Sequence, residues 1–86
     1  MKKCVYVVRD DLRGYIGPLS QADNDAIAMR DFAVAIQSDA GLLGRRRGDF
    51  RLYCVADFDL ESGVLTACDP RLVAEGLSIT GGVVDG

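Results

Sequence analysis

The stretch from residue 50 to residue 68 constrains the fold of this chain more than any other part of the sequence. Residues 50–58 alternate in character, and their more apolar set is Phe50, Leu52, Cys54, Ala56 and Phe58. Such alternation is typical of a β-strand with one buried face. Turn-forming residues at 59–63 separate this strand from a second apolar run at 64–68. The two runs therefore predict a β-hairpin closed by a short loop.

Two further elements precede the hairpin. Residues 3–9 are rich in β-branched and aromatic types over the length of a strand. Residues 10–19 contain two glycines and a proline, and we expect a loop or short extended arm there. From about Ser20 the pattern favours a helix capped by Ser20 or Asp23 and ended by residues 38–41. The apolar stripe of this helix comprises Ala28, Phe32, Ala35 and Ile36.

These elements predict a small two-layer α+β domain of order β-α-β-β, with one helix on one face of a three-stranded sheet. Over residues 71–75 we expect a helical turn that ends at Gly76. We expect residues 1–76 to form the single domain and residues 77–86 a flexible C-terminal tail. The expected core consists of Phe32, Ile36, Leu52 and Phe58. The uncovered sheet face and two free edges predict a homodimer or higher oligomer.

The composition argues against catalysis. The chain contains no histidine, so the usual general base at neutral pH is missing, and we expect no enzyme activity, no cofactor and no metal site. The three cysteines are widely spaced within apolar segments, as reduced structural cysteines are. No apolar run approaches the roughly 18 residues of a membrane span, so we expect no membrane partner.

A net charge of −3 opposes simple electrostatic binding of nucleic acid. The cations are unevenly placed, however, and Arg45, Arg46 and Arg47 form a glycine-flanked cluster in an expected loop. Such arginines either contact phosphate or keep the loop soluble. If the chain binds DNA, we expect this loop to carry the binding. The candidate nucleic-acid-binding residues are Arg45, Arg46, Arg47, Arg51, Tyr53, Arg9 and Arg13, with Tyr15 a further stacking surface.

Two segments resemble a known viral family. They read RDFAVAIQSD at 30–39 and GDFRLYCVADFDLESG at 48–63. They are similar to the small nonstructural protein of gokushovirus-type microviruses, in which a helix ending R-x-F-x-x-A-V-x-D precedes D-[FY]-x-L-Y-x-x-[GA]-x-[FY]-D-x-x-[ST]-G. The resemblance covers residues 5 to about 76. That family commonly carries Pro-Glu-Asp before the aromatic residue of this strand, where this chain has Arg47-Gly48-Asp49.

The resemblance implies a phage accessory protein made in the bacterial cytoplasm, described as DNA-binding and linked to production of a single-stranded genome. It identifies no DNA-contacting residue. Two hypotheses therefore stand. The chain binds single-stranded DNA, or it is an interaction or assembly module that engages a capsid, replication or host protein through its open sheet face or an edge strand.

Overall fold

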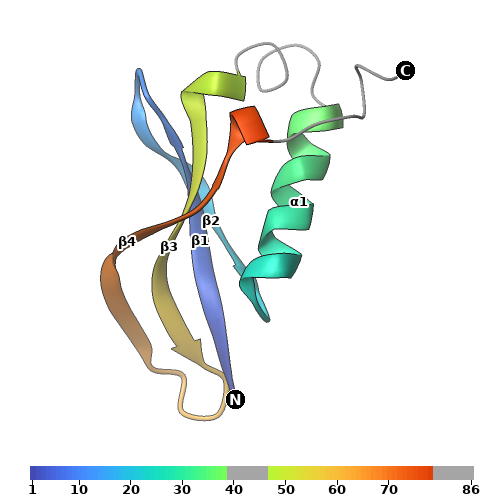
Figure 1. Cartoon of the computed structure of the whole chain (residues 1–86). Helices are drawn as coiled ribbons and strands as arrows, with labels where there is room; N and C mark the ends of the chain where they lie inside the picture. The colour runs from blue at the N-terminus through green and yellow to red at the C-terminus, as the bar shows by residue number, and fades with distance from the viewer. Residues whose placement is uncertain (39–46, 79–86) are drawn as a thin grey trace.

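The computed structural model describes residues 1–38 and 47–78 of the chain. Its strands are β1 (Lys2–Asp10), β2 (Gly14–Ala22), β3 (Phe50–Asp59) and β4 (Leu65–Glu75), and its helix is α1 (Asp25–Ser38). Short 3-10 turns lie at η1 (Arg47–Asp49) and η2 (Gly76–Ser78). The strands form one antiparallel sheet in the order β2-β1-β3-β4, with α1 on one side (Figure 1). The α+β class is confirmed, but the described residues contain four strands rather than three.

The additional strand is β2, which occupies much of the segment expected to be a loop. A tight turn returns the chain after β1, because the Arg13 N–H donates to the Asp10 carbonyl at 3.1 Å and Gly14 adopts a φ of 87°. This is the geometry of a short hairpin in which the residue that ends the turn, Gly14, has a left-handed backbone conformation. Pro18 fits within β2 because β2 is an edge strand, where a missing N–H breaks no ladder on the outer side.

The helix begins later than expected. Ser20 lies in β2, and the residue that caps α1 is Asn24, whose Oδ1 accepts from the Ile27 N–H at 2.9 Å. Asn is among the best N-cap residues because its side chain satisfies an otherwise unpaired amide of the first turn. Asp25 follows, where a carboxylate interacts favourably with the helix dipole.

The β3–β4 hairpin is confirmed, and its second strand is longer than expected. The Asp59 carboxylate accepts from the Glu61 and Ser62 amides at 2.9 and 3.3 Å, and Gly63 adopts a φ of 76°. These backbone hydrogen bonds lower the pKa of Asp59. Residues 71–75 are strand rather than a helical turn, because they pair with residues 51–54 of β3. The helical turn comes after them, at Gly76–Ser78.

The core lies between α1 and one face of the sheet. Phe32 and Leu52 are each 4% exposed and Ile36 is fully buried, so these three predicted core residues are confirmed. Their buried partners are Tyr6, Ala22, Ala28, Phe50, Cys54 and Ala74. Phe58 is only partly buried and is not in this cluster. The prediction for Phe58 was wrong.

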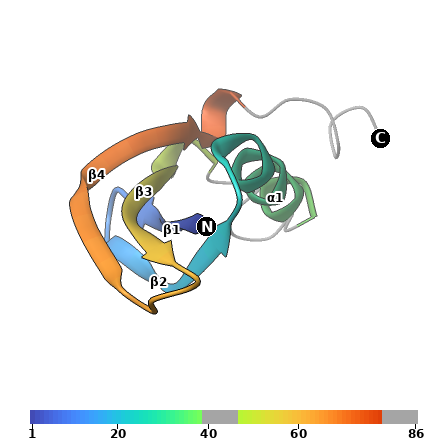
Figure 2. The ribbon, with the colours of Figure 1, turned by 90° about the horizontal axis from the view of Figure 1, so that it is seen from below.

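Phe58 leaves the core because β3 contains one extra residue, Val55, relative to β1. Cys54 pairs with Tyr6, but Ala56 pairs with Val5, which is the next residue along β1. Directly paired residues share a face and adjacent residues in a strand do not. Beyond Val55, Ala56 and Phe58 therefore face away from α1. A bulge also increases local twist, and the sheet curls strongly when viewed along its strands (Figure 2).

A polar network joins the outer strand β4 to the start of α1. Two nitrogens of the Arg71 guanidinium donate to the Asp25 carboxylate at 2.7 and 3.2 Å. The buried Tyr6 hydroxyl donates to the same carboxylate at 2.7 Å. The bonds from Arg71 and then Tyr6 lower the pKa of Asp25, whereas burial and the bond to Asp25 raise that of Tyr6. Asp25 thus links the edge strand, the core and the helix.

We expect Phe32→Ala to lower the free energy of unfolding by about 3–5 kcal/mol, because it removes a ring from the centre of the core and leaves a cavity. Urea denaturation measures the change. Val34→Ala, on the exposed side of the same helix, is the matched control and should shift stability by about 0.5 kcal/mol or less. Equal effects of the two substitutions would contradict this placement of the core.

We expect Asp25→Asn to destabilise the protein at pH 7 and to lose that effect in acid. A carboxyl group with a lowered folded pKa contributes stability above its unfolded pKa of about 3.9, and loses it as pH falls through the folded value. Urea titrations of parent and variant between neutral and acid pH measure the difference. In an Arg71→Met background the difference at pH 7 should shrink. If the difference in the free energy of unfolding between parent and variant does not depend on pH, the charge of Asp25 does not contribute to stability.

Candidate binding face of the sheet

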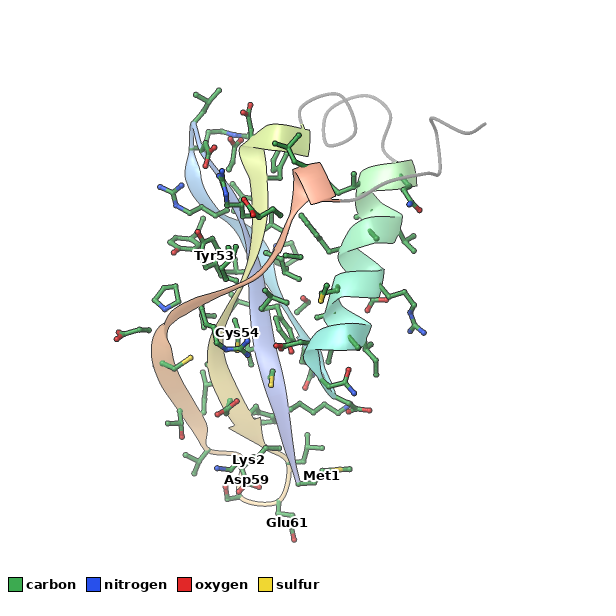
Figure 3. The ribbon with its side chains drawn as sticks, in the orientation of Figure 1. Met1, Lys2, Tyr53, Cys54, Asp59 and Glu61 are labelled. Carbon is green, nitrogen blue, oxygen red and sulfur yellow. The ribbon has the colours of Figure 1, made fainter. Side chains whose placement is uncertain are left out.

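The face of the sheet turned away from α1, here called the open face, carries most of the predicted site residues that the structure describes. Alternation along β1 directs Val5, Val7 and Arg9 to this face, because Tyr6 and Val8 pack against the core on the other. Tyr53 pairs with Val7 and points away from the helix (Figure 3). The described helix does not cover this face. Val5 and Val7 are nevertheless buried, and the large side chains exposed on the face include Tyr15 and Leu19.

Three strands bring an aromatic pair and two arginines together at one end of the open face. In the ladders, Arg9 is opposite both Tyr15 of β2 and Arg51 of β3. The rings of Tyr15 and Tyr53 meet edge to face, with centroids 5.7 Å apart at 73°. The Arg9 guanidinium lies 5.7 Å from the Tyr15 ring centroid, within cation–π range. These four residues form what we call the aromatic–arginine cluster.

Two acids neutralise the cations of this cluster. The Asp11 carboxylate accepts from Arg51 at 2.6 Å and from Arg9 at 3.3 Å. Glu75 lies opposite Arg51 in the β3–β4 ladder and accepts from it at 3.4 Å. The bond to Asp11, and to a lesser degree Glu75, raises the pKa of Arg51. A phosphate reaching these arginines therefore has to displace a carboxylate.

The remaining predicted residues do not join the cluster in the described structure. Arg13 donates to Asp10 at 2.8 Å, and Asp10 is fully buried on the helix side of β1. Arg47 begins η1, but the structure describes only its backbone. Arg45 and Arg46 lie outside the described residues. The arginine loop therefore stays a prediction.

Beyond the bulge at Val55, the open face continues as an apolar groove of about 360 Å³. The residues that line this apolar groove are Val5, Leu19, Ser20, Gln21, Phe58 and Leu65. Sequence reasoning missed it because residues 10–19 were expected to be a loop and Phe58 a core residue. It also missed Asp11, whose partner Arg51 is 40 positions away and comes close only through the β1–β3 register.

The chemistry of this face is suited to contact with planar groups. Its aromatic–arginine cluster presents ring faces, ring edges and planar guanidinium groups, which are the surfaces that unpaired bases stack on. In residues 1–38 and 47–78, no group of three or more potential metal ligands comes together. In the same residues, no helix has the length and apolar character needed to cross a membrane.

Comparison with protein families gives a match. The sequence model of a family described as Phage ORF5 protein matches residues 3–79. The match extends through α1 and through almost the whole sheet, including the strands that carry the cluster and the groove. No curated protein and no solved structure matches this chain.

Proposed function

This chain belongs to the Phage ORF5 protein family, a family of bacteriophage proteins, and from that premise we propose that it binds single-stranded DNA on its open face. In this proposal it acts by binding, without catalysis, while the viral genome is produced in the cytoplasm of the bacterial host. The resemblance of residues 30–39 and 48–63 to the small nonstructural protein of gokushovirus-type microviruses supports this setting.

The observation that carries the proposal is the aromatic–arginine cluster. Tyr15 is 49% exposed, although it packs against Tyr53 and under Arg9. Stacking on aromatic rings accepts any base, and each stacked base contributes about 1–3 kcal/mol by alanine substitution. A cluster on a sheet that curls around it suits a flexible strand whose bases are unpaired. Duplex DNA keeps its bases stacked on one another and cannot use these rings.

The acids of the cluster set the character of the proposed binding. Asp11 and Glu75 already pair with Arg9 and Arg51. When DNA phosphates displace these carboxylates, the freed carboxylates take up cations, so the net release of counterions is small. We therefore expect affinity to depend on stacking more than on phosphate contacts, with a shallow dependence on salt. In this proposal an acidic chain binds DNA without a large positive field. Arg45, Arg46 and Arg47 remain proposed phosphate contacts, and their triple alanine variant belongs in the same assay.

A specific observation also favours the alternative function, an interaction or assembly module. The apolar groove offers hydrocarbon surface on the same open face, and Lys3, which lies opposite its lining residue Phe58, is paired with Asp23. Apolar grooves are typical of protein contacts. The two functions occupy different halves of the face, so they are compatible in one molecule.

We expect Tyr53→Ala to weaken binding of a fluorescent oligo-dT roughly 5- to 150-fold, which corresponds to the loss of one stacked base. Fluorescence anisotropy at one fixed salt concentration measures the affinity. Tyr53→Phe keeps the ring and should bind like the parent, and Tyr15→Ala tests the second ring. If the parent does not bind, or if Tyr53→Ala binds as tightly as the parent, the proposed site is wrong.

We expect Asp11→Asn to strengthen binding, because it keeps the shape of the side chain, frees Arg9 for phosphate and leaves Arg51 only its longer bond to Glu75. The slope of log affinity against log salt should steepen by up to about 1.4, or 0.7 for each new contact. Asp31→Asn makes the same change of charge on the exposed surface of α1 and should have little effect. An equal gain from Asp31→Asn would mean that only the overall charge matters.

A further inference from the structure

The apolar groove keeps large hydrocarbon side chains in contact with water. Leu19 and Leu65 stand on its two sides, from the outer strands β2 and β4, and are 59% and 57% exposed. Val64, beside Leu65 in the hairpin, is 56% exposed. Contiguous apolar surface of this kind is usually covered by a partner. The prolines of the outer strands and the charges near the groove indicate which kind of partner fits it.

Proline residues disfavour a partner that adds a strand to the sheet. Pro18 lies in β2 and Pro70 lies in β4, so each outer strand of the described sheet has a position without an N–H donor. Both ladders are also irregular beside these prolines. An extended peptide cannot form a regular ladder along such an edge. The partner therefore packs side chains against the face.

Charge at the groove disfavours a polyanion. Lys3 is opposite Phe58 in the β1–β3 ladder, but its ammonium group pairs with Asp23 at 3.3 Å. At the hairpin tip the Met1 ammonium group pairs with Glu61 at 3.1 Å (Figure 3). These two cations are thus paired within the chain, so a polyanion would have to displace a carboxylate from each. A second copy that contacts the groove through hydrocarbon leaves both pairs in place.

The same surface contains both a hollow and a projection. The β3–β4 hairpin continues beyond the groove-lining Leu65 and carries the exposed side chains of Leu60 and Val64 in its loop. Such a surface is self-complementary, because the projecting apolar side chains of one copy can pack into the apolar groove of a second copy. Two copies related by a two-fold axis place the hairpin of each against the groove of the other, which closes the assembly at two members.

We propose that the apolar groove is the surface through which two copies of this chain associate as a symmetric dimer, with Leu19 and Leu65 at the centre of the contact. The inference does not rest on DNA binding, because the aromatic–arginine cluster lies on the other side of the bulge at Val55 and stays uncovered.

The size of the patch sets the expected strength of the dimer. A patch of about six residues along four strands measures roughly 20 by 15 Å. This footprint is smaller than the roughly 800 Å² that each partner buries in a standard interface. The dimer should therefore be reversible, with a dissociation constant in the micromolar range or weaker.

Sedimentation equilibrium of the full chain up to about 1 mM tests the proposal. The parent should pass from monomer to dimer as concentration rises. Leu19→Glu and Leu65→Glu each place two carboxylates in a symmetric apolar contact, and each should weaken dimerisation at least about 10-fold. Val34→Glu is the matched control, since Val34 is 56% exposed on α1, and it should dimerise like the parent. Circular dichroism checks that each variant is folded.

A dilution series of the parent followed by methyl NMR needs no variant. Shifts that change with concentration should map to Val5, Leu19, Val64 and Leu65. A parent that remains monomeric at the highest concentration would overturn the proposal, and so would a dimer that survives both glutamate substitutions. Loss of DNA binding in Tyr53→Ala with dimerisation unchanged would separate this inference from the proposed function.

Discussion

The extra residue at Val55 is the constraint on which the arrangement of this protein depends. Before it, Leu52 and Cys54 face α1 and complete the core; after it, Ala56 and Phe58 face the other way. A regular strand would place Tyr53, Val55 and Asp57 on the open face and keep Phe58 on the helix side. Because the alternation is reset, β3 adds Ala56 and Phe58 to the hydrocarbon that Val5, Leu19 and Leu65 place on the open face, and both faces of the sheet are apolar. The helix covers one of them, and the curl of the sheet partly shelters Val5 and its neighbours on the other.

Ion pairing determines what the surface can bind. Each arginine whose side chain the structure describes has an acidic partner within 4 Å; they are Arg9, Arg13, Arg30, Arg51 and Arg71. These pairs differ in consequence. The Arg30–Asp31 pair joins neighbours within one helix and contributes little to stability, whereas the Arg71–Asp25 pair joins the outer strand to the helix. On the open face the pairs neutralise positive charge but leave the planar guanidinium groups in place, which favours the proposed contacts through stacking and hydrocarbon.

Local periodicity was enough to predict the hairpin, β1 and the buried face of α1, because each depends on a regular pattern of apolar residues. Periodicity failed where the pairing register between strands determines which face of the sheet a residue lies on. Gly17 and Pro18 indicated a loop, yet an edge strand tolerates both. Nothing in residues 50–58 reveals a bulge, since their alternation continues unbroken on paper. The candidate site divides in the same way: Arg9, Arg51 and Tyr53 could be named by residue type, but their convergence, and their neutralisation by Asp11, arise from the pairing of distant strands.

The bulge also has a consequence for how such a sequence can change over evolutionary time. A single-codon deletion near Val55 would restore continuous pairing with β1 and turn Ala56 and Phe58 toward α1, which would abolish the apolar groove while leaving hydrophobicity along the segment nearly unchanged. An insertion would be equally disruptive. Substitutions in β3 should therefore be tolerated more readily than changes in its length, and alignments of related sequences should run without gaps from Phe50 to Asp59.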